Sequence, residues 1–541
     1  MSKRISGVLA HPTSFPSAFG IGDLGQGAYD FVRFLHESGQ RLWQVLPLGP
    51  TSYGDSPYQS FSTFAGNPLL ISPEKLLEQG YLTEEDLESI PEFDPRRVDY
   101  GRVIEYKDSL YRKAFARADV AMDGVAFRKF CKSNAEWLDD FTLFMACKHH
   151  LIETRRLEPS EDSEELAAYR ERNIDVMSEE LIKDCYYGAA WSSWPAGLKS
   201  RDSRTLNEWA TLLQPEIQYL KFLQFLFFGQ WKELRDYANG LDIQIVGDIP
   251  IFVALDSADV WANRGGFLLC EEGYPLVVAG VPPDYFTETG QLWGNPIYDW
   301  AAHERTGFKW WTARIKSSLE MYDIVRIDHF RGFDEYWEVP YGEKTAMNGK
   351  WKKGPGKALF SALSRELNDM PIIAEDLGVM TPTVEKLRDQ LGFPGMKILQ
   401  FAFDDTPDNV SLPHNYGTTN LVVYPGTHDN DTSAGWYAAA DAEVQDRFRR
   451  YLQVSGRDAA WDMIRLAFST TADYAIVSLQ DVMSLGSADR MNLPGTAAGN
   501  WKFRYTADML REDMSEGLKY LSGMYNRNAK DMHLSAKPPI I

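Results

Sequence analysis

The sequence contains no long apolar run and few cysteines. No stretch of about 18 apolar residues occurs, and the N-terminal MSKRISGVLAHPTSF lacks the apolar core of a secretory signal peptide. A cleaved organellar leader would leave the same sequence. The cysteines include no CxxC pair and no histidine at zinc-site spacing. We therefore expect a cytoplasmic protein with reduced thiols at Cys131, Cys147, Cys185 and Cys270.

Basic residues are scarce relative to acidic ones. The chain has 56 Lys and Arg against 77 Asp and Glu, a net charge of −21. Nucleic acids and anionic membranes attract positively charged surfaces, so this balance argues against both as partners. It fits a protein that acts on an uncharged or small substrate.

Aromatic residues, by contrast, are abundant. They make up 13% of the chain and include 16 Trp and 26 Tyr. Two interpretations remain open at this point. A chain of 541 residues can bury a large aromatic core, and aromatic faces can also stack on sugar rings.

Eight short apolar runs recur along the chain, and each ends in polar or charged residues. Helical patterns follow them, for example in AYDFVRFLHESG (28–39) and VEKLRDQLGF (384–393). Short apolar strands that alternate with helices are typical of parallel sheets, and eight of them predict a closed (β/α)8 barrel. The runs are ISGVLAHP (5–12), RLWQVLPLGP (41–50), IQIVGDIPIF (243–252), DIVRIDHF (323–330), PIIAEDLG (371–378), MKILQFAF (396–403), NLVVYPGTHDND (420–431) and YAIVSLQDV (474–482).

The length of the chain predicts large insertions in this barrel. A plain barrel needs roughly 250 residues. We expect residues 1–541 to form one catalytic barrel domain with mainly helical insertions at its C-terminal rim. One insertion spans approximately 60–240, between the second and third strands, and a second, at approximately 252–322, would cover the substrate as a lid. About 60 residues follow the last run, too few for a closing helix and an appended β-sandwich domain.

Four of the eight runs place an acidic residue near the expected C-terminal end of a strand. Active sites of (β/α)8 barrels lie at the C-terminal ends of the strands. A single acid at such a position could equally be a helix N-cap or an ion-pair partner. Four acids at matched positions favour a catalytic site, and they are Asp248, Asp328, Glu375 and Asp429.

Paired carboxylates perform glycosyl transfer through an oxocarbenium-like transition state. Arg326 precedes Asp328 by two residues, so strand alternation points both side chains the same way and the guanidinium would keep Asp328 anionic. Glu375 would face the negative charges of Asp328 and Asp429, which would raise its pKa. We predict Asp328 as nucleophile and Glu375 as general acid and then base. His428 and Asp429 would hold the sugar hydroxyls and stabilise a distorted ring.

These residues resemble the machinery of the α-amylase clan, and the chain is most similar to the 4-α-glucanotransferases (amylomaltases, or disproportionating enzymes). The resemblance extends from about residue 6 to 505. It is carried in order by SPYQSFSTFAGNPLLI (56–71), GDIPIFVALDSADVW (247–261), GVPPDYFTETGQLWGNPIY (280–298), RIDHFRGF (326–333), AEDLG (374–378), GTHDNDT (426–432), RMNLPGT (490–496) and GNW (499–501).

The resemblance implies a retaining transfer of α-1,4-glucan segments between maltooligosaccharides, through a covalent glycosyl–aspartate intermediate. It implies no cofactor and no metal. Asp328, Glu375 and Asp429 would be the catalytic residues. The loop PDYFTETGQLW would supply Asp284, Tyr285, Phe286 and Trp293 as a lid that closes over the glucan and excludes water from the intermediate. The implied substrate contacts are Ser56, Tyr58, Asp248, Asp284, Tyr285, Phe286, Trp293, Arg326, His428 and Asn492.

Three other functions compete with this one. An α-glucan hydrolase could use the same three acids, so only reaction products separate it from a transferase. A glucan-binding protein on an inactive barrel is disfavoured because no catalytic acid is missing. GIGDLG (20–25) matches a dinucleotide-binding GxGxxG, but HPTSFPSAF separates it from the preceding strand, and no acid ends the next run. The oligomeric state stays open.

Overall fold

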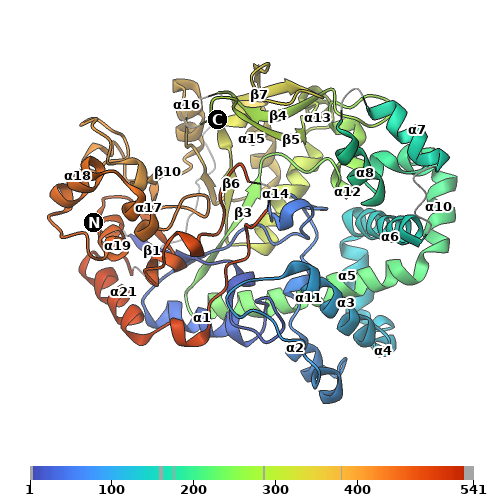
Figure 1. The fold of residues 1–541 in the computed structure, drawn as a ribbon, viewed down its shortest axis with the longest axis horizontal. Helices are drawn as coiled ribbons and strands as arrows, with labels where there is room; N and C mark the ends of the chain where they lie inside the picture. The colour runs from blue at the N-terminus through green and yellow to red at the C-terminus, as the bar shows by residue number, and fades with distance from the viewer. Residues whose placement is uncertain are drawn as a thin grey trace.

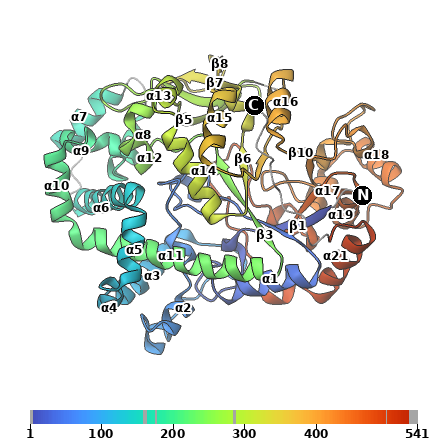
Figure 2. The same cartoon turned by 180° about the vertical axis from the view of Figure 1, so that it is seen from behind.

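Eight parallel strands form a nearly closed barrel in the computed structural model of this chain (Figures 1 and 2). The structure describes residues 4–157, 163–174, 177–283, 287–378, 380–496 and 498–528. Each barrel strand falls on one of the eight predicted runs, so the barrel prediction is confirmed. The strands are β1 (Ile5–Leu9), β2 (Leu42–Gln44), β3 (Gln244–Pro250), β6 (Ile324–Asp328), β9 (Ile372–Ala374), β10 (Gly395–Ile398), β11 (Leu421–Tyr424) and β12 (Tyr474–Ser478).

The order of the strands around the barrel is β10-β11-β12-β1-β2-β3-β6-β9. At the seam between β9 and β10, the amide of Ala374 donates to the carbonyl of Pro394 at 3.0 Å. Gly7 of β1 lies where a side chain would meet the Leu42 carbonyl of β2, with a Cβ only 2.2 Å from that oxygen. The absence of a side chain at Gly7 is therefore what lets these two strands pair closely.

The barrel interior is apolar in the middle of the strands and polar toward their C-terminal ends. Val246 and Ile324 belong to a buried apolar cluster, with residues of the other strands. Two residues further along the same strands stand Asp248 and Arg326, which alternation places on the same face. The strands therefore place charged side chains at the C-terminal rim, next to a layer of buried apolar side chains.

Helices surround the barrel where the apolar spacing predicts them. The helix predicted at 28–39 is α1 (Gln26–Glu37), and its buried face includes Phe31, Phe34 and Leu35. The helix predicted at 384–393 is α16 (Pro382–Leu391), which ends at Gly392 with φ of 70°. Further helices along the second half of the chain are α14 (Lys309–Met321), α15 (Gly356–Glu366), α17 (Ser433–Ala439), α18 (Ala442–Leu452), α19 (Ala459–Ser469), α20 (Leu479–Val482) and α21 (Glu512–Met524).

Helices between β2 and β3 gather on one side of the barrel, opposite α17–α19 and α21 (Figure 1). The long helix α11 packs on β3 and α1 as a barrel helix, and it also contacts α3, α5, α6 and α10 of the insertion. It therefore anchors the insertion to the barrel wall. The helices are α2 (Pro73–Glu78), α3 (Tyr100–Phe115), α4 (Asp119–Met122), α5 (Val125–Ser133), α6 (Ala135–Leu157), α7 (Glu164–Asn173), α8 (Glu179–Tyr187), α9 (Ala196–Lys199), α10 (Ser203–Leu212) and α11 (Gln214–Gly240).

A second, antiparallel sheet was not expected from the sequence. Its strands are β5 (Gln291–Pro296), β4 (Val277–Val281), β7 (Glu335–Pro340) and β8 (Lys350–Lys353), paired in that order. Two come from the segment between β3 and β6, which also contains α12 (Ala258–Ala262) and α13 (Trp300–Arg305), and two follow β6. Glycine, proline and mixed polar residues obscure the alternation of these strands, so only the long-range pairing reveals them.

Across the described ranges, no helix is both long and apolar enough to cross a membrane. All four cysteines are free thiols, and Cys147 is buried.

A buried lysine connects the insertion to the barrel. Lys107 of α3 is fully buried and lies 3.3 Å from Asp23, which is itself buried. Its ammonium also donates to the carbonyls of Leu69 (2.8 Å) and Ile71 (3.1 Å). One cation thus satisfies a carboxylate and two carbonyls that water does not reach.

We expect Lys107→Met to destabilise the protein by about 3–5 kcal/mol, because the Asp23 carboxylate would stay buried without its partner. The change would appear as a lower midpoint in urea unfolding. Arg204→Met is the matched control, since its pair with Glu208 is exposed at 87% and 59% and should cost less than about 1 kcal/mol. Equal losses in the two variants would contradict this account of Lys107.

Candidate active site at the C-terminal rim of the barrel

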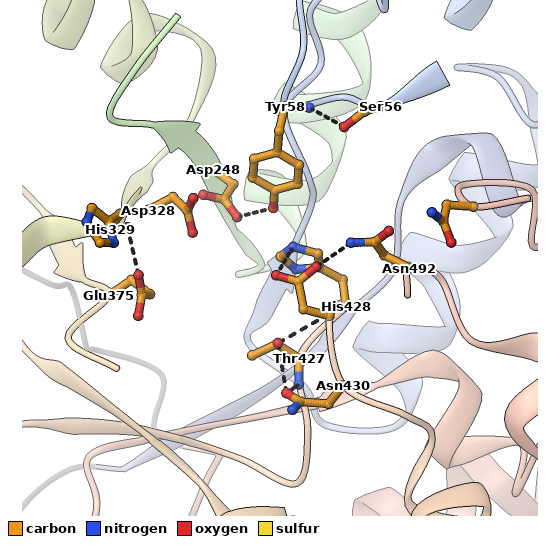
Figure 3. Close-up of polar contacts among 12 residues, drawn as sticks. Ser56, Tyr58, Asp248, Asp328, His329, Glu375, Thr427, His428, Asn430 and Asn492 are labelled. Carbon is orange, nitrogen blue, oxygen red and sulfur yellow. Dashed lines mark hydrogen bonds and ion pairs between the residues drawn. The ribbon is translucent and has the colours of Figure 1, made fainter. Parts of the chain in front are cut away.

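Charged side chains converge where four barrel strands end (Figure 3). Asp248 lies on β3, and Asp328 is the last residue of β6. Glu375 directly follows β9, and the pair His428–Asp429 comes four residues after β11. The four acids predicted at strand ends therefore meet at one rim.

A single guanidinium connects two of these acids. Arg326 contacts both oxygens of Asp248 through Nη1, at 2.8 and 2.7 Å, and contacts Asp328 through Nη2 at 2.9 Å. The hydroxyl of Tyr58 donates to the same Asp248 carboxylate at 2.8 Å. Arg326 and Asp248 are buried, whereas the side chain of Asp328 is 30% exposed. Of the two carboxylates, only Asp328 is open to an incoming ligand.

Burial and charge oppose each other in this network. Burial raises the pKa of Asp248, and the Arg326 guanidinium opposes that shift. Burial acts to lower the pKa of Arg326, but Asp248 and Asp328 outweigh it and hold the pKa well above its ordinary value. The guanidinium therefore remains charged, and it compensates the carboxylate of Asp328 at the edge of the site.

Glu375 is held by two backbone amides. Its oxygens accept from the N–H of His329 at 2.7 Å and of Leu377 at 2.8 Å. His329 has a φ of 52°, a left-handed conformation that is uncommon for a non-glycine residue. The carboxyl group is thus oriented by main chain on both sides.

Burial is the largest cause of the unusual acidity of Glu375. It raises the pKa of Glu375 to about 7, and the charge of Asp328 adds to the shift, while Arg326 and the two amides act against it. The sequence prediction of a raised pKa holds, but its explanation by Asp328 and Asp429 must be corrected, because desolvation contributes most. A carboxyl group with such a pKa can exchange a proton near neutral pH.

His428 and Asn492 hold Asp429. His428 Nε2 lies 3.3 Å from one oxygen of Asp429, and the Asn492 amide donates to the other at 2.6 Å. Burial acts to raise the pKa of Asp429, but His428 and this amide outweigh it and hold the pKa below its usual range. Asp429 in turn raises the pKa of His428 against the effect of burial. The ring of Tyr58 stacks on His428, 5.0 Å between centroids, and so fixes the imidazole.

An open groove with a volume of about 1130 Å³ lies at this rim. Asp328 and Asp429 line it, together with five of the predicted substrate contacts, namely Ser56, Tyr58, Trp293, His428 and Asn492. Glu375 is not among its lining residues, and neither are Asp248 and Arg326, which lie buried beneath Tyr58 and Asp328. The predicted contacts Asp284, Tyr285 and Phe286 lie outside the described residues.

One wall of the groove comes from a region to which the sequence assigned no binding role. Residues of the insertion, among them Leu181, Trp191 and Ser192, line the groove. Trp191 is fixed there by its indole N–H, which donates to the Leu255 carbonyl at 2.7 Å, and by its amide, which donates to Asp256 at 3.1 Å. The two tryptophans of WSSWP (191–195) were the feature of the sequence that could have indicated an aromatic wall. Their position at the groove depends on long-range packing, which the sequence does not show.

Two further residues near the acids were missed. His329 supplies its amide to Glu375, and its ring meets the Trp293 ring edge-on at 4.8 Å. Trp501 lines the groove, 5.8 Å from Tyr58 and 6.0 Å from His428 between ring centroids. The GNW block ended at Trp501, but a role for it could not be inferred without the barrel.

Chemically, the site combines an accessible carboxylate that an arginine compensates with a second carboxyl group able to carry a proton. This is the pair that displacement at a glycosidic carbon requires. In the parts of the chain that the structure describes, no three His, Cys, Asp or Glu side chains are grouped to hold a metal ion.

Replacing Glu375 by Gln should change the pH dependence of stability. Because its folded-state pKa is raised, the wild-type protein loses stability as pH rises from the unfolded-state pKa through about 7. The glutamine side chain of the variant cannot ionise, so the Tm difference between variant and wild type should move in favour of the variant between about pH 5 and about pH 8. A Tm difference that is constant across this range would contradict the assigned pKa.

Comparison with known proteins identifies relatives along almost the whole chain. A family model described as 4-alpha-glucanotransferase matches residues 10–510. The 4-alpha-glucanotransferase of Synechocystis sp. is 48% identical, covering 97% of this chain and 99% of the relative. That of Thermus thermophilus is 46% identical, covering 93% and 94%. The solved structure of amylomaltase from Streptococcus agalactiae in complex with acarbose has a TM-score of 0.88 and 38% identity, and covers 97% of this chain and 100% of its own.

Proposed function

Because this chain belongs to the 4-alpha-glucanotransferase family, we propose that it transfers α-1,4-glucan segments between maltooligosaccharides by a retaining mechanism. Donor and acceptor are both glucans. The intermediate is a glycosyl ester of Asp328. The observation that carries this proposal is the contrast between Asp328, compensated by Arg326, and Glu375, whose pKa is raised to about 7.

In the first step, a carboxylate oxygen of Asp328 attacks the anomeric carbon of the donor. The bond from that carbon to the glycosidic oxygen breaks, and Glu375 gives its proton to this oxygen. The leaving glucan then carries a free 4-hydroxyl group. Glu375 can serve as the acid because a pKa of about 7 lets its carboxyl group both carry and release a proton near neutral pH.

In the second step, the 4-hydroxyl of an acceptor glucan attacks the same anomeric carbon. Glu375, now ionised, takes the hydroxyl proton, and the bond to Asp328 breaks. Two displacements at one carbon restore its original configuration. Donor and acceptor are both sugars, so no net hydrolysis occurs.

Asp429 and His428 contact the sugar next to the reacting bond. The Asp429 side chain is 45% exposed to the groove and is held anionic, so it can accept hydrogen bonds from ring hydroxyls. Such bonds strengthen as the ring flattens toward the transition state. Tyr58, Asp248 and Arg326 contribute by positioning Asp328 and His428.

Exclusion of water decides between transfer and hydrolysis, the second candidate activity. Trp191 and Trp293 give the groove aromatic walls that can pack against the apolar faces of glucose units. An occupied groove leaves little room for water at the intermediate. The lid role of Asp284, Tyr285 and Phe286 stays a prediction, as does a cytoplasmic location.

The direct test is incubation with pure maltotriose and chromatography of the products over time. We expect glucose together with a ladder of longer maltooligosaccharides, while the total number of reducing ends stays constant, because each cleavage is matched by one new bond. Glucose and maltose alone, with reducing ends rising, would instead establish a hydrolase. EDTA should leave the ladder unchanged.

The assigned roles of the two acids predict different behaviour with an activated donor. Asp328→Asn should abolish transfer from both maltotriose and α-glucosyl fluoride, because neither can react without the nucleophile. Glu375→Gln should lose maltotriose turnover by about 10²–10⁴-fold. It should still release fluoride rapidly in the first turnover of the fluoride donor, because that leaving group needs no proton, while later turnovers should be slow because the acceptor hydroxyl has lost its base. Rapid-quench measurement of fluoride and of sugar products separates the two steps. A first turnover of the fluoride that is slowed as much as maltotriose turnover would remove the acid role.

A further inference from the structure

A second cavity lies on the outer side of the molecule, away from the catalytic groove. We call it the outer cavity; it has a volume of about 630 Å³ and lies among the start of α6, α12 and helices α13 and α14. These elements neighbour one another in Figure 2. Among the described residues, none lines both the outer cavity and the catalytic groove. The segment at 254–263 separates them, with residues 254–256 on the groove and residues 258, 259, 262 and 263 on the outer cavity.

Aromatic rings form a corner of the outer cavity. Phe64 stacks with Trp137 at 6.5 Å and an interplanar angle of 14°, and meets Trp310 edge-on at 6.2 Å and 88°. Both tryptophans are only half-buried. The indole N–H of Trp137 donates to Asn134 at 3.1 Å, which fixes the ring in place. Partly exposed, fixed indole faces are suited to the apolar face of a sugar ring.

Polar groups of both signs complete the lining. The acids are Glu136, Asp140, Asp259 and Glu320, and the bases are Arg264, Lys309 and Lys316. Asp140 pairs with Arg201 at 2.5 Å, Asp259 accepts from the Thr63 amide at 2.8 Å, and Arg264 donates to backbone carbonyls. A lining of both signs is not specific for an anion or a cation, and it offers donors and acceptors to hydroxyl groups.

The size of the outer cavity suits a small ligand. A volume of about 630 Å³ is in the range of small-molecule sites.

We propose that the outer cavity is a non-catalytic site for a segment of α-1,4-glucan, which holds a long chain while another part of it reacts in the groove. The identity of the ligand rests on the proposed function, because the lining by itself indicates a neutral, hydroxyl-rich molecule. A chain attached at this site would present its other segments to the groove at a raised effective concentration. Maltotriose is too short to gain from this.

The test compares a long and a short substrate in two variants. One variant enlarges the outer cavity and the other fills it. Trp137→Ala removes a stacking face, and Ser317→Trp fills the cavity from α14. Both should raise the KM for soluble amylose about three- to tenfold, the loss of one aromatic contact. The kcat/KM for maltotriose should stay within about twofold of wild type. Trp209→Ala is the control, because Trp209 is also half-buried on the insertion but lines neither cavity.

Binding is measured separately by native electrophoresis in gels that contain amylose, with Asp328→Asn in every sample so that no transfer occurs. Combining Asp328→Asn with Trp137→Ala or Ser317→Trp should reduce the retardation of the protein by amylose. Combining it with Trp209→Ala should leave the retardation unchanged. Unchanged retardation and unchanged amylose KM in both variants would overturn the proposal. So would equal loss on maltotriose and amylose, which indicates a structural role. A wild-type protein that makes no longer oligosaccharides would refute the proposed function, while the gel would still decide on the outer cavity.

Discussion

The active site depends on one buried arginine, whose positive charge compensates two neighbouring carboxylates. Arg326 is buried at the centre of the barrel mouth and bonds both oxygens of Asp248 as well as one oxygen of Asp328. A buried ion pair is stable only when its geometry is good and its remaining polar atoms are satisfied. The hydroxyl of Tyr58 supplies one such contact to Asp248. The position of Asp328 at the edge of the groove follows from this arrangement.

The second acid obtains its properties from its surroundings in a different way. Glu375 has no cation in direct contact among the described residues; two backbone amides orient it, and burial keeps its pKa near 7. One of those amides belongs to His329, whose left-handed backbone turns the N–H toward the carboxyl group. Two carboxyl groups at the ends of adjacent strands thus have different surroundings, because Asp328 contacts a guanidinium and Glu375 contacts two main-chain amides in a buried position.

The insertions determine what the rim can bind. The segment at 254–263 packs between the catalytic groove and the outer cavity, and Trp191 of the insertion is bonded to its first residues. Lys148 of α6 pairs with Asp256 at 2.6 Å at the same place. The wall of the groove and the floor of the outer cavity are therefore parts of one connected structure, built on a barrel that supplies the charged side chains of the rim.

The amino-acid sequence by itself determined the eight strands and the rim to which their acids belong. Each strand is a local apolar run, and parallel strands in a barrel bring their C-terminal ends to one rim whatever the insertions do. Tertiary structure alone decided that Arg326 bonds Asp248 as well as Asp328, and that Tyr58 reaches Asp248 across 190 positions. It also decided the antiparallel sheet, the Trp191 wall and the burial that raises the pKa of Glu375. These features arise from contacts between distant segments, which local periodicity does not specify.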